Sequence, residues 1–300
     1  MIDLRYHIAS IVAVFLALGL GILIGSTIVG DNLLVDQQKK MIDRLEGQFY
    51  SLRERESELS VSNQYKDQII ANYENYSQAL LPPLVKEHLT GYQVALVVTG
   101  GSDIPAGMLN ALSIAGANVV SKSVVLSNIS LDEANLRQRV QEFYGLDKEV
   151  SPDVLRQYVA ASVAAVITDK ADPGVISFLQ ENDLLKFSGS NTMPLNGIVL
   201  LGGTNNLAGF FAASFDHTLI ESLAQQGLKI FGVENSKVTY SYMEEYQKDK
   251  ISTIDNVDLS PGQISLVYAM EGEPGDYGIK VTAKKFMPSL PVESVNKQQR

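Results

Sequence analysis

The chain has 300 residues, of which 45% are hydrophobic and 19% are charged, and its net charge is −10. This composition indicates a globular body, and the acidic balance argues against binding to nucleic acid, whose phosphates require Lys and Arg, and against binding of the body to anionic lipid. The chain has no cysteine, which excludes disulfides, thiol catalysis and cysteine-ligated metal centres.

The first element is a membrane anchor. A short tail, residues 1–7, precedes residues 8–30, which carry no charged side chain. A helix of this length crosses a hydrocarbon core of about 30 Å. The segment is longer than a secretory h-region and has no A-x-A cleavage site, so it predicts an uncleaved, single-pass anchor. Basic residues flank it on both sides, and long domains translocate largely regardless of charge, so the charge pattern leaves the orientation open.

Small residues recur every four positions along this anchor. In a bilayer the hydrophobic effect does not drive helices together, because lipid tails are as apolar as the side chains. Transmembrane helices usually pack where small side chains let their backbones approach closely. The pattern therefore predicts self-association or binding to a partner helix, the alternative being that the small side chains face lipid. The predicted helix-packing residues are Ala9, Ala13, Ala17, Gly21 and Gly25.

Residues 31–81 contain no proline and predict a helical stalk. Apolar residues recur with heptad spacing, which is typical of a coiled coil of about 75 Å. The alternative is a single solvated helix packed on the body. The predicted seam comprises Met41, Leu45, Leu52, Leu59, Ile69, Tyr73, Tyr76 and Leu80. Pro82 and Pro83 are expected to end the helix. One event, parallel association of copies, would satisfy both the seam and the small-residue pattern, so we expect a homodimer or a higher homo-oligomer.

Residues 84–290 predict an α/β domain, and residues 291–300 a flexible tail. Buried aliphatic strands are expected at 94–98, 117–126, 198–201 and 228–233, with two late strands at 264–270 and 277–283. Helices are expected at 105–115 and 217–226, from a capping box at 130–133 up to Gly145, and after Ser151-Pro152 and Asp172-Pro173. The resulting architecture is a mostly parallel, open, Rossmann-like sheet.

Two glycine pairs, at 100–101 and 202–203, follow predicted strands. Neither matches GxGxxG or GxxxxGK[ST], so tight turns are favoured over a phosphate site. A ligand of such a sheet would lie beyond the carboxyl ends of its strands. The residues predicted there are Thr99, Ser102, Asp103, Thr204, Asn205 and Asn206. No catalytic residue is predicted, and an enzyme is not expected.

Metal-ligating residues do not cluster in the sequence. His88 and His217 match no triad or HExxH pattern, and we interpret residues 255–258 as a turn rather than as a cation loop. A soft copper site would need clustered Met, Cys or His. The methionines of the body are instead scattered, at Met108, Met193, Met243, Met270 and Met287. Neither a metal site nor a cofactor is predicted.

Four short motifs carry a resemblance to a known family. They are the opening MIDLRYH at 1–7, DNVD at 255–258, GQISLV at 262–267 and GDYG at 275–278. With the layout of anchor, coil and α/β body, they resemble the mycobacterial copper transport protein B (MctB) family. The resemblance implies a bacterial envelope protein with its body outside the cytoplasm, a family described as channel-forming and protective against copper. Relatives in corynebacteria are linked to envelope and division control.

Two hypotheses follow from this resemblance. The chain is a component of copper efflux, acting as an oligomer associated with a channel, or it is a non-enzymatic envelope scaffold or division regulator that presents its α/β domain to a partner protein in the envelope. Copper enters through the family resemblance alone.

Overall fold

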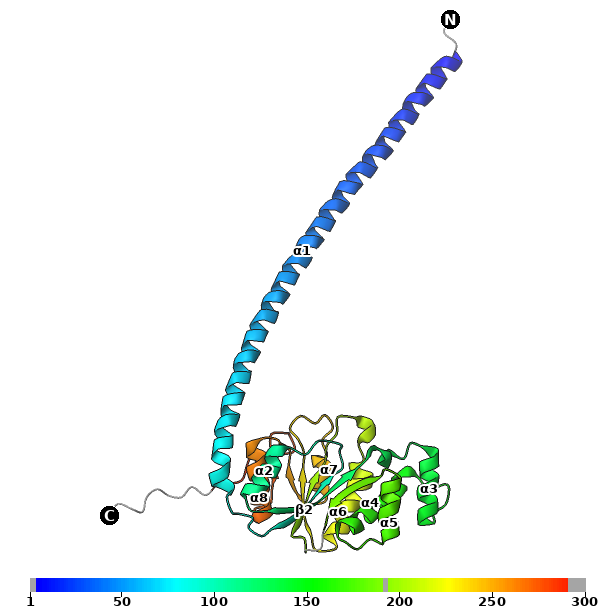
Figure 1. Cartoon of the computed structure of the whole chain (residues 1–300). Coiled ribbons are helices and arrows are strands. Elements are labelled where there is room, and N and C mark those ends of the chain that lie inside the picture. Colours follow the sequence, from blue (N-terminus) through cyan, green and yellow to red (C-terminus); the bar gives the residue numbers. More distant parts are fainter. Residues whose placement is uncertain (1–3, 191–193, 291–300) are drawn as a thin grey trace, which may run out of the picture. The chain divides into compact units, whose positions relative to one another are not determined.

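The computed structural model describes residues 4–190 and 194–290, and the side chains of these residues other than 27–34. It divides into two compact units, one that ends at Ala71 and one that begins at Asn72. The predicted tail at 291–300 and Met193 lie outside the described residues. Helix α1 (Leu4–Val85) is one continuous element that contributes to both units (Figure 1).

The end of α1 corrects one prediction. The helix continues through Pro82 and Pro83 to Val85 instead of ending before them. Proline removes a backbone donor and disfavours a helix interior. Here Leu81 and Val85 are buried in the core of the second unit, and this burial outweighs the cost of prolines in the last turn.

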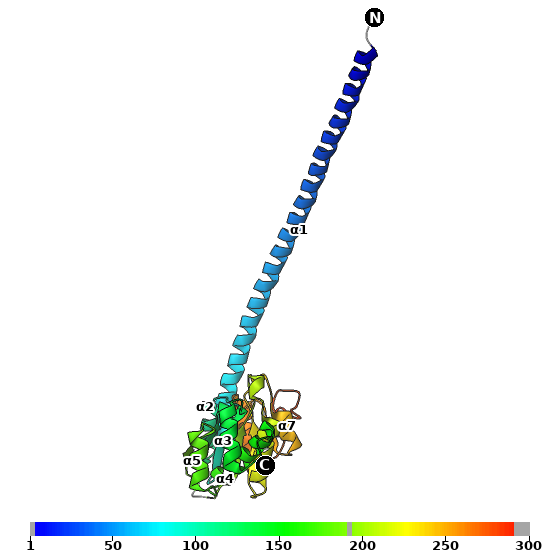
Figure 2. The same ribbon diagram turned by 90° about the vertical axis from the view of Figure 1, so that its right-hand side faces the viewer.

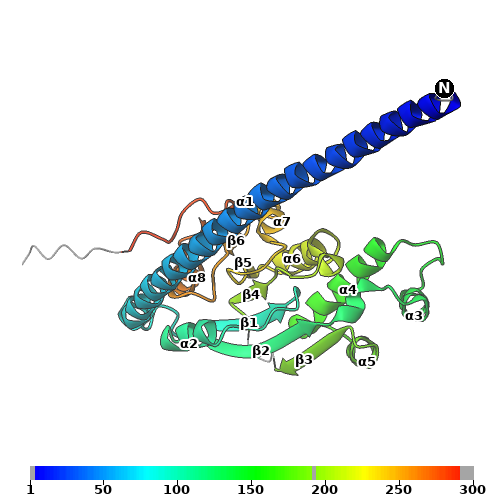
Figure 3. The ribbon, with the colours of Figure 1, turned by 90° about the horizontal axis from the view of Figure 1, so that it is seen from above.

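The described strands form one seven-stranded sheet of order β3-β2-β1-β4-β5-β6-β7. Figure 3 shows the neighbouring strands from β3 to β6 in this order. All pairs are parallel except β2 with β3, which confirms the mostly parallel sheet. The strands are β1 (Gln93–Val98), β2 (Asn118–Val125), β3 (Leu185–Gly189), β4 (Gly197–Leu201), β5 (Lys229–Val233), β6 (Ser252–Ile254) and β7 (Asp276–Tyr277).

Helices cover both faces of this sheet (Figure 1). Helices α2 and α8 lie on one face with the end of α1, and α3 to α7 pack on the other, the side that Figure 2 views. They are α2 (Ala106–Ile114), α3 (Ala134–Tyr144), α4 (Pro152–Ile167), α5 (Pro173–Glu181), α6 (His217–Ala224), α7 (Met243–Lys248) and α8 (Ser260–Glu271). Shorter turns are η1 (Ser127–Ser130), η2 (Leu207–Gly209) and the π-helical η3 (Ala212–Asp216).

The central strand β1 shows why the sheet has two cores. Val94, Leu96 and Val98 belong to the core beneath α2 and α8, whereas Ala95 and Val97 belong to the core beneath α4 and α6. Side chains alternate between the faces of a strand, so a strand covered on both sides is apolar at every position. This is the physical basis of the unbroken aliphatic run.

Three predicted elements were wrong. Residues 264–270 are helical, within α8, and residues 277–283 form a strand only as far as Tyr277. Helix α3 begins at Ala134, one turn after Ser130, whose hydroxyl accepts from the Asp132 N–H. The error at α8 has a clear cause: ten of its residues are buried, so it shows no amphipathic period, and a short buried helix cannot be told from a buried strand by pattern. The antiparallel edge strand β3 and the short β6 and α7 were not predicted.

Candidate functional site

The carboxyl ends of β1 and β4 meet at the point where the strand order reverses. From β1 the chain moves to β2 on one side, and from β4 it moves to β5 on the other. Open α/β sheets bind ligands outside the strand ends at such a switch point. The structure therefore brings together the two glycine pairs and places Thr99, Ser102 and Thr204 where the sequence predicted a crevice.

Backbone contacts fill this crevice. A methyl group at Gly100 would lie 1.9 Å from the Gly203 carbonyl oxygen, and the Ser102 hydroxyl donates to that same oxygen at 3.3 Å. A methyl group at Gly202 would lie 2.2 Å from the Tyr246 hydroxyl oxygen. The glycines thus let two loops and a tyrosine pack closely, which favours their interpretation as structural turns.

The other predicted crevice residues are bound to neighbouring loops. The Asn205 side-chain oxygen accepts from Thr239 N–H and Oγ1, at 2.9 and 3.0 Å. Thr204 Oγ1 accepts from the Asn206 N–H at 3.2 Å. The Asp103 carbonyl accepts from Asn235 Nδ2 at 3.4 Å, whereas the Asp103 side chain is exposed. These six residues line one edge of the sheet, and apart from the exposed Asp103 carboxylate their polar side chains are engaged in the fold.

Thr99 leads to a buried carboxylate that sequence reasoning missed. Its hydroxyl donates to Asp216 Oδ2 at 2.7 Å, and the Tyr246 hydroxyl donates to the same oxygen at 2.5 Å. Asp216 ends the π-helical turn η3. Burial raises the pKa of Asp216 to about 7, although both hydrogen bonds act in the opposite direction. The only signal in the sequence was a lone acidic residue inside the apolar run 210–220.

A second buried carboxylate lies at the end of β5. Glu234 Oε1 accepts from Lys280 Nζ and from Ser241 Oγ, both at 2.6 Å, and Oε2 accepts from the Tyr242 N–H at 3.0 Å. Burial raises the pKa of Glu234, and Lys280 opposes that shift. The sequence signal for this residue was an acidic side chain directly after an apolar strand, which was not interpreted as a candidate site.

The third buried carboxylate, Asp255, lies at the end of β6. Its two oxygens accept from the N–H groups of Ile279 and Lys280, at 2.7 and 2.9 Å. Asp258 likewise accepts from Ser236 N–H and Oγ, both at 2.7 Å. Both carboxylates therefore serve as acceptors for the protein itself, which favours the interpretation of 255–258 as a structural turn.

In the structure, each of the two histidines of the body meets one carboxylate. His88 Nδ1 lies 2.7 Å from Glu271, and His217 Nδ1 lies 2.5 Å from Asp249. Among the described residues, no three His, Cys, Asp or Glu side chains come close enough to hold a metal ion. Met108, Met243 and Met270 are buried in the two cores, and Met287 packs against one of them.

On the body-attached part of α1, the heptad seam and the covered face are different sides of the helix. Tyr73 and Tyr76 are 70% and 63% exposed, whereas Leu81 and Val85 are buried against the second unit. At about 100° per residue, the two sets lie on well-separated faces. All described side chains between Val35 and Gln68 are also exposed, including the seam residues Met41, Leu45, Leu52 and Leu59.

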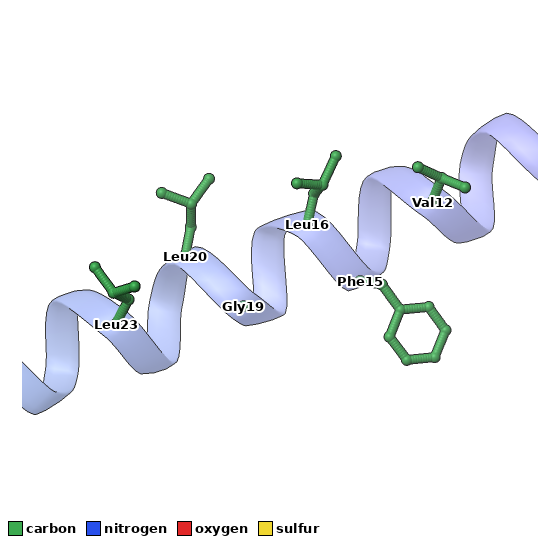
Figure 4. Close-up of a pocket in the computed structure, with 6 residues that line it drawn as sticks. All are labelled: Val12, Phe15, Leu16, Gly19, Leu20 and Leu23. Atoms are coloured by element: carbon green, nitrogen blue, oxygen red, sulfur yellow. The ribbon is translucent and has the colours of Figure 1, made fainter.

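Leu4–Ser26 is long and apolar enough to cross a membrane. It overlaps the predicted anchor; side chains 27–30 lie outside the description. Figure 4 shows a second feature of this segment, a groove in which Gly19 leaves the backbone bare between Leu16 and Leu20 on one side and Phe15 on the other. By helical phase this groove and the predicted small-residue row occupy different faces. The glycine of the groove was not among the predicted packing residues.

Comparison with known proteins places these features in context. A family model described as "Copper transport outer membrane protein, MctB" matches residues 1–288. Proteins named "Copper transporter MctB" from Mycobacterium bovis and from two strains of Mycobacterium tuberculosis are 24% identical to this chain over 321 aligned residues. The alignment covers 93% of this chain and 96% of each relative.

Proposed function

The chain belongs to the MctB family of copper transport proteins, and we propose that it is an anchored envelope protein that takes part in copper efflux. The observation that carries this proposal is the family match over residues 1–288, which includes the apolar helix Leu4–Ser26. Copper is here the cargo. Among the described residues no three His, Cys, Asp or Glu side chains could hold a metal ion. With one candidate span per chain, a role in transport requires assembly with other copies or with a channel.

We propose that α1 builds this assembly by pairing with the same helix of another copy. One helix cannot enclose a pore, and the seam from Met41 to Leu80 is apolar and, apart from the partly buried Ile69, exposed in the single chain. Within the second unit the body covers Leu81 and Val85, whereas the seam residues Tyr73 and Tyr76 are exposed on a different face of the helix, so a second copy can contact them. Parallel pairing in one membrane also raises the effective concentration of the seams.

We place the body outside the cytoplasm, as its family resemblance implies. The chain has no cysteine, so a single Lys237→Cys substitution on an exposed side chain provides a unique label. In intact cells a membrane-impermeant maleimide should label this variant without prior lysis. Labelling that occurs only after lysis would place the body in the cytoplasm and overturn the proposal.

The copper role is tested in a deletion strain. Loss of the protein should increase sensitivity to copper while leaving sensitivity to zinc unchanged, and the wild-type gene should restore tolerance. Unchanged copper tolerance would contradict a role in efflux.

A second candidate function is a non-enzymatic scaffold or division regulator. It is favoured by the filled strand-end edge, where Gly100, Gly203 and Tyr246 occupy the space in which related sheets bind ligands. Normal copper tolerance combined with a division defect in the deletion strain would select this function over copper efflux.

A further inference from the structure

The loop from Gly278 to Phe286 presents apolar side chains to solvent. Val281 is fully exposed, at 105% of its reference area, and Ile279 and Phe286 are 55% and 54% exposed. Scattered exposed apolar residues are ordinary, but three within eight positions on one loop form a concentrated apolar surface. Nothing shields the Val281 side chain, so it projects from the loop.

The two ends of the loop lie side by side. The Gly278 N–H donates to the Lys285 carbonyl at 2.9 Å, and the N–H groups of Lys284 and Lys285 donate to the Asp276 carbonyl. A further turn, from Ala283 N–H to the Lys280 carbonyl, closes the tip. Compact loops with adjoining ends are frequently binding elements.

Buried charges hold this loop in one conformation. The Asp255 carboxylate binds the N–H groups of Ile279 and Lys280, and buried Glu234 binds Lys280 Nζ. Gln247 Nε2 donates to the Thr282 carbonyl at 3.0 Å. Burying a carboxylate is costly unless hydrogen bonds and ion pairs compensate for the lost water. Here the compensating bonds come from the loop itself, and they hold it so that Lys280 points inward and Val281 outward. A surface that is already ordered loses little entropy on binding.

Two lysines border the apolar tip. Lys284 and Lys285 are both exposed, and Lys284 Nζ pairs with Asp276 at 2.6 Å while its side chain remains 78% exposed. An apolar tip beside basic side chains is the combination by which peripheral elements enter anionic bilayers. The net charge of −10 is a sum over the whole chain, so it gave no indication of a local surface with exposed lysines.

We propose that the loop 278–286 is a second membrane contact, which inserts Ile279, Val281 and Phe286 into an anionic bilayer. A bilayer fits better than a protein partner, because Val281 projects from the loop, the exposed Lys284 and Lys285 lie beside it, and the chain carries a helix that is apolar and long enough to cross a membrane. It does not depend on whether the protein moves copper.

The absence of tryptophan makes a direct test simple. Full-length Val281→Trp protein carries a single reporter at the tip, and Leu207→Trp, at a side chain that is 63% exposed on η2, is the matched control. Each is reconstituted into vesicles that contain phosphatidylglycerol, with brominated lipid either in the host membrane or in added empty vesicles. The two arms distinguish insertion into the bilayer that holds the anchor from insertion into an opposing one.

Emission of the Val281→Trp protein should shift to the blue and be quenched by brominated lipid in one of the arms, while Leu207→Trp shows neither effect. Phosphatidylcholine alone, or an added Lys285→Gln substitution, should reduce the quenching. Equal emission of the two proteins would overturn the proposal. A blue shift without quenching in either arm would show a protein contact and would overturn it as well.

Discussion

The carboxylate of Glu74 on α1 accepts hydrogen bonds from the backbone N–H and the hydroxyl of Ser260, at 3.2 and 2.8 Å. Ser260 is the first residue of α8, and the preceding Leu259 has no side-chain acceptor. The first N–H groups of a helix lack partners inside it and favour a negative charge. One helix therefore caps another, and this contact joins the end of α1 to the core of the second unit.

Glu74→Ala should remove this cap. We expect the free energy of unfolding to fall by about 1–2 kcal/mol, because Ser260 loses its acceptor and the negative charge leaves the start of α8. Urea denaturation of the full chain in detergent, followed by circular dichroism, measures the change. Glu54→Ala, on an exposed position of the same helix, is the control and should leave the value unchanged. Equal effects of the two substitutions would rule out the capping role.

Gly278→Ala should be strongly destabilising. Gly278 has φ +142°, and a methyl group there would lie 2.0 Å from Asp255 Oδ1. The new side chain would push the carboxylate away from the N–H groups of Ile279 and Lys280, in addition to straining the backbone. We expect a loss of roughly 3 kcal/mol or more, in line with an unpaired buried carboxylate.

Gly91→Ala is the matched control for this substitution. Gly91 also has positive φ, at +79°, but a methyl group there meets nothing within 4 Å. Only the backbone strain applies, which costs about 1 kcal/mol. If Gly91→Ala and Gly278→Ala lower the midpoint of urea denaturation equally, the clash with Asp255 contributes nothing.

Asp216 should make stability depend on pH. Its pKa in the folded protein, about 7, lies above the ordinary value of 3.8, so the folded state binds the proton more tightly than the unfolded state does. The resulting stability is complete below about pH 4 and is lost as pH rises through 7, by roughly 1.4 kcal/mol per pH unit within this window. Asp216→Asn should remove this component.

Urea denaturation of the wild type and of Asp216→Asn at pH 5, 6, 7 and 8 tests the assignment. The amide oxygen of the variant can still accept from Thr99 and Tyr246. Relative to the wild type, the variant should therefore gain stability as pH rises toward 8. Parallel curves for the two proteins would show that Asp216 titrates outside this window.

The proposed seam predicts a pattern of cross-links. Leu52→Cys and Leu59→Cys occupy core positions of the heptad, whereas Ser57→Cys lies on the outer face. In native membranes, diamide should convert the two seam variants to disulfide-linked dimers and leave the Ser57→Cys variant monomeric. Equal cross-linking at all three positions would indicate random collision, and its absence at both seam positions would contradict the parallel coil.

Several features could be predicted from the sequence because their causes are local. An apolar segment long enough for a bilayer forms a helix with its own backbone hydrogen bonds, so the helix over Leu4–Ser26 needs no tertiary information. Aliphatic runs followed by glycine pairs likewise identified β1 and β4. The prediction failed at α8, where complete burial removes the alternation between polar and apolar faces.

The candidate strand-end residues show what could not be predicted from the sequence. The sequence predicted that Thr99 and Thr204 follow strands whose carboxyl ends meet at one edge of the sheet, and β1 and β4 are neighbours in the strand order. It could not show that Gly100 and Gly203 pack against each other, nor that Thr99 binds a buried carboxylate 117 positions away. Such contacts depend on how loops pack after the sheet has formed.

By itself, then, the sequence determined the long apolar N-terminal helix, the heptad pattern and the mostly parallel α/β architecture, since each arises from composition, periodicity and burial over neighbouring residues. Only the tertiary structure decided that Glu74 caps α8, that Asp216 is buried and that Asp255 holds the loop after Gly278. Hydrogen bonds between distant positions require a particular packing of the chain, and local sequence preference carries no record of that packing.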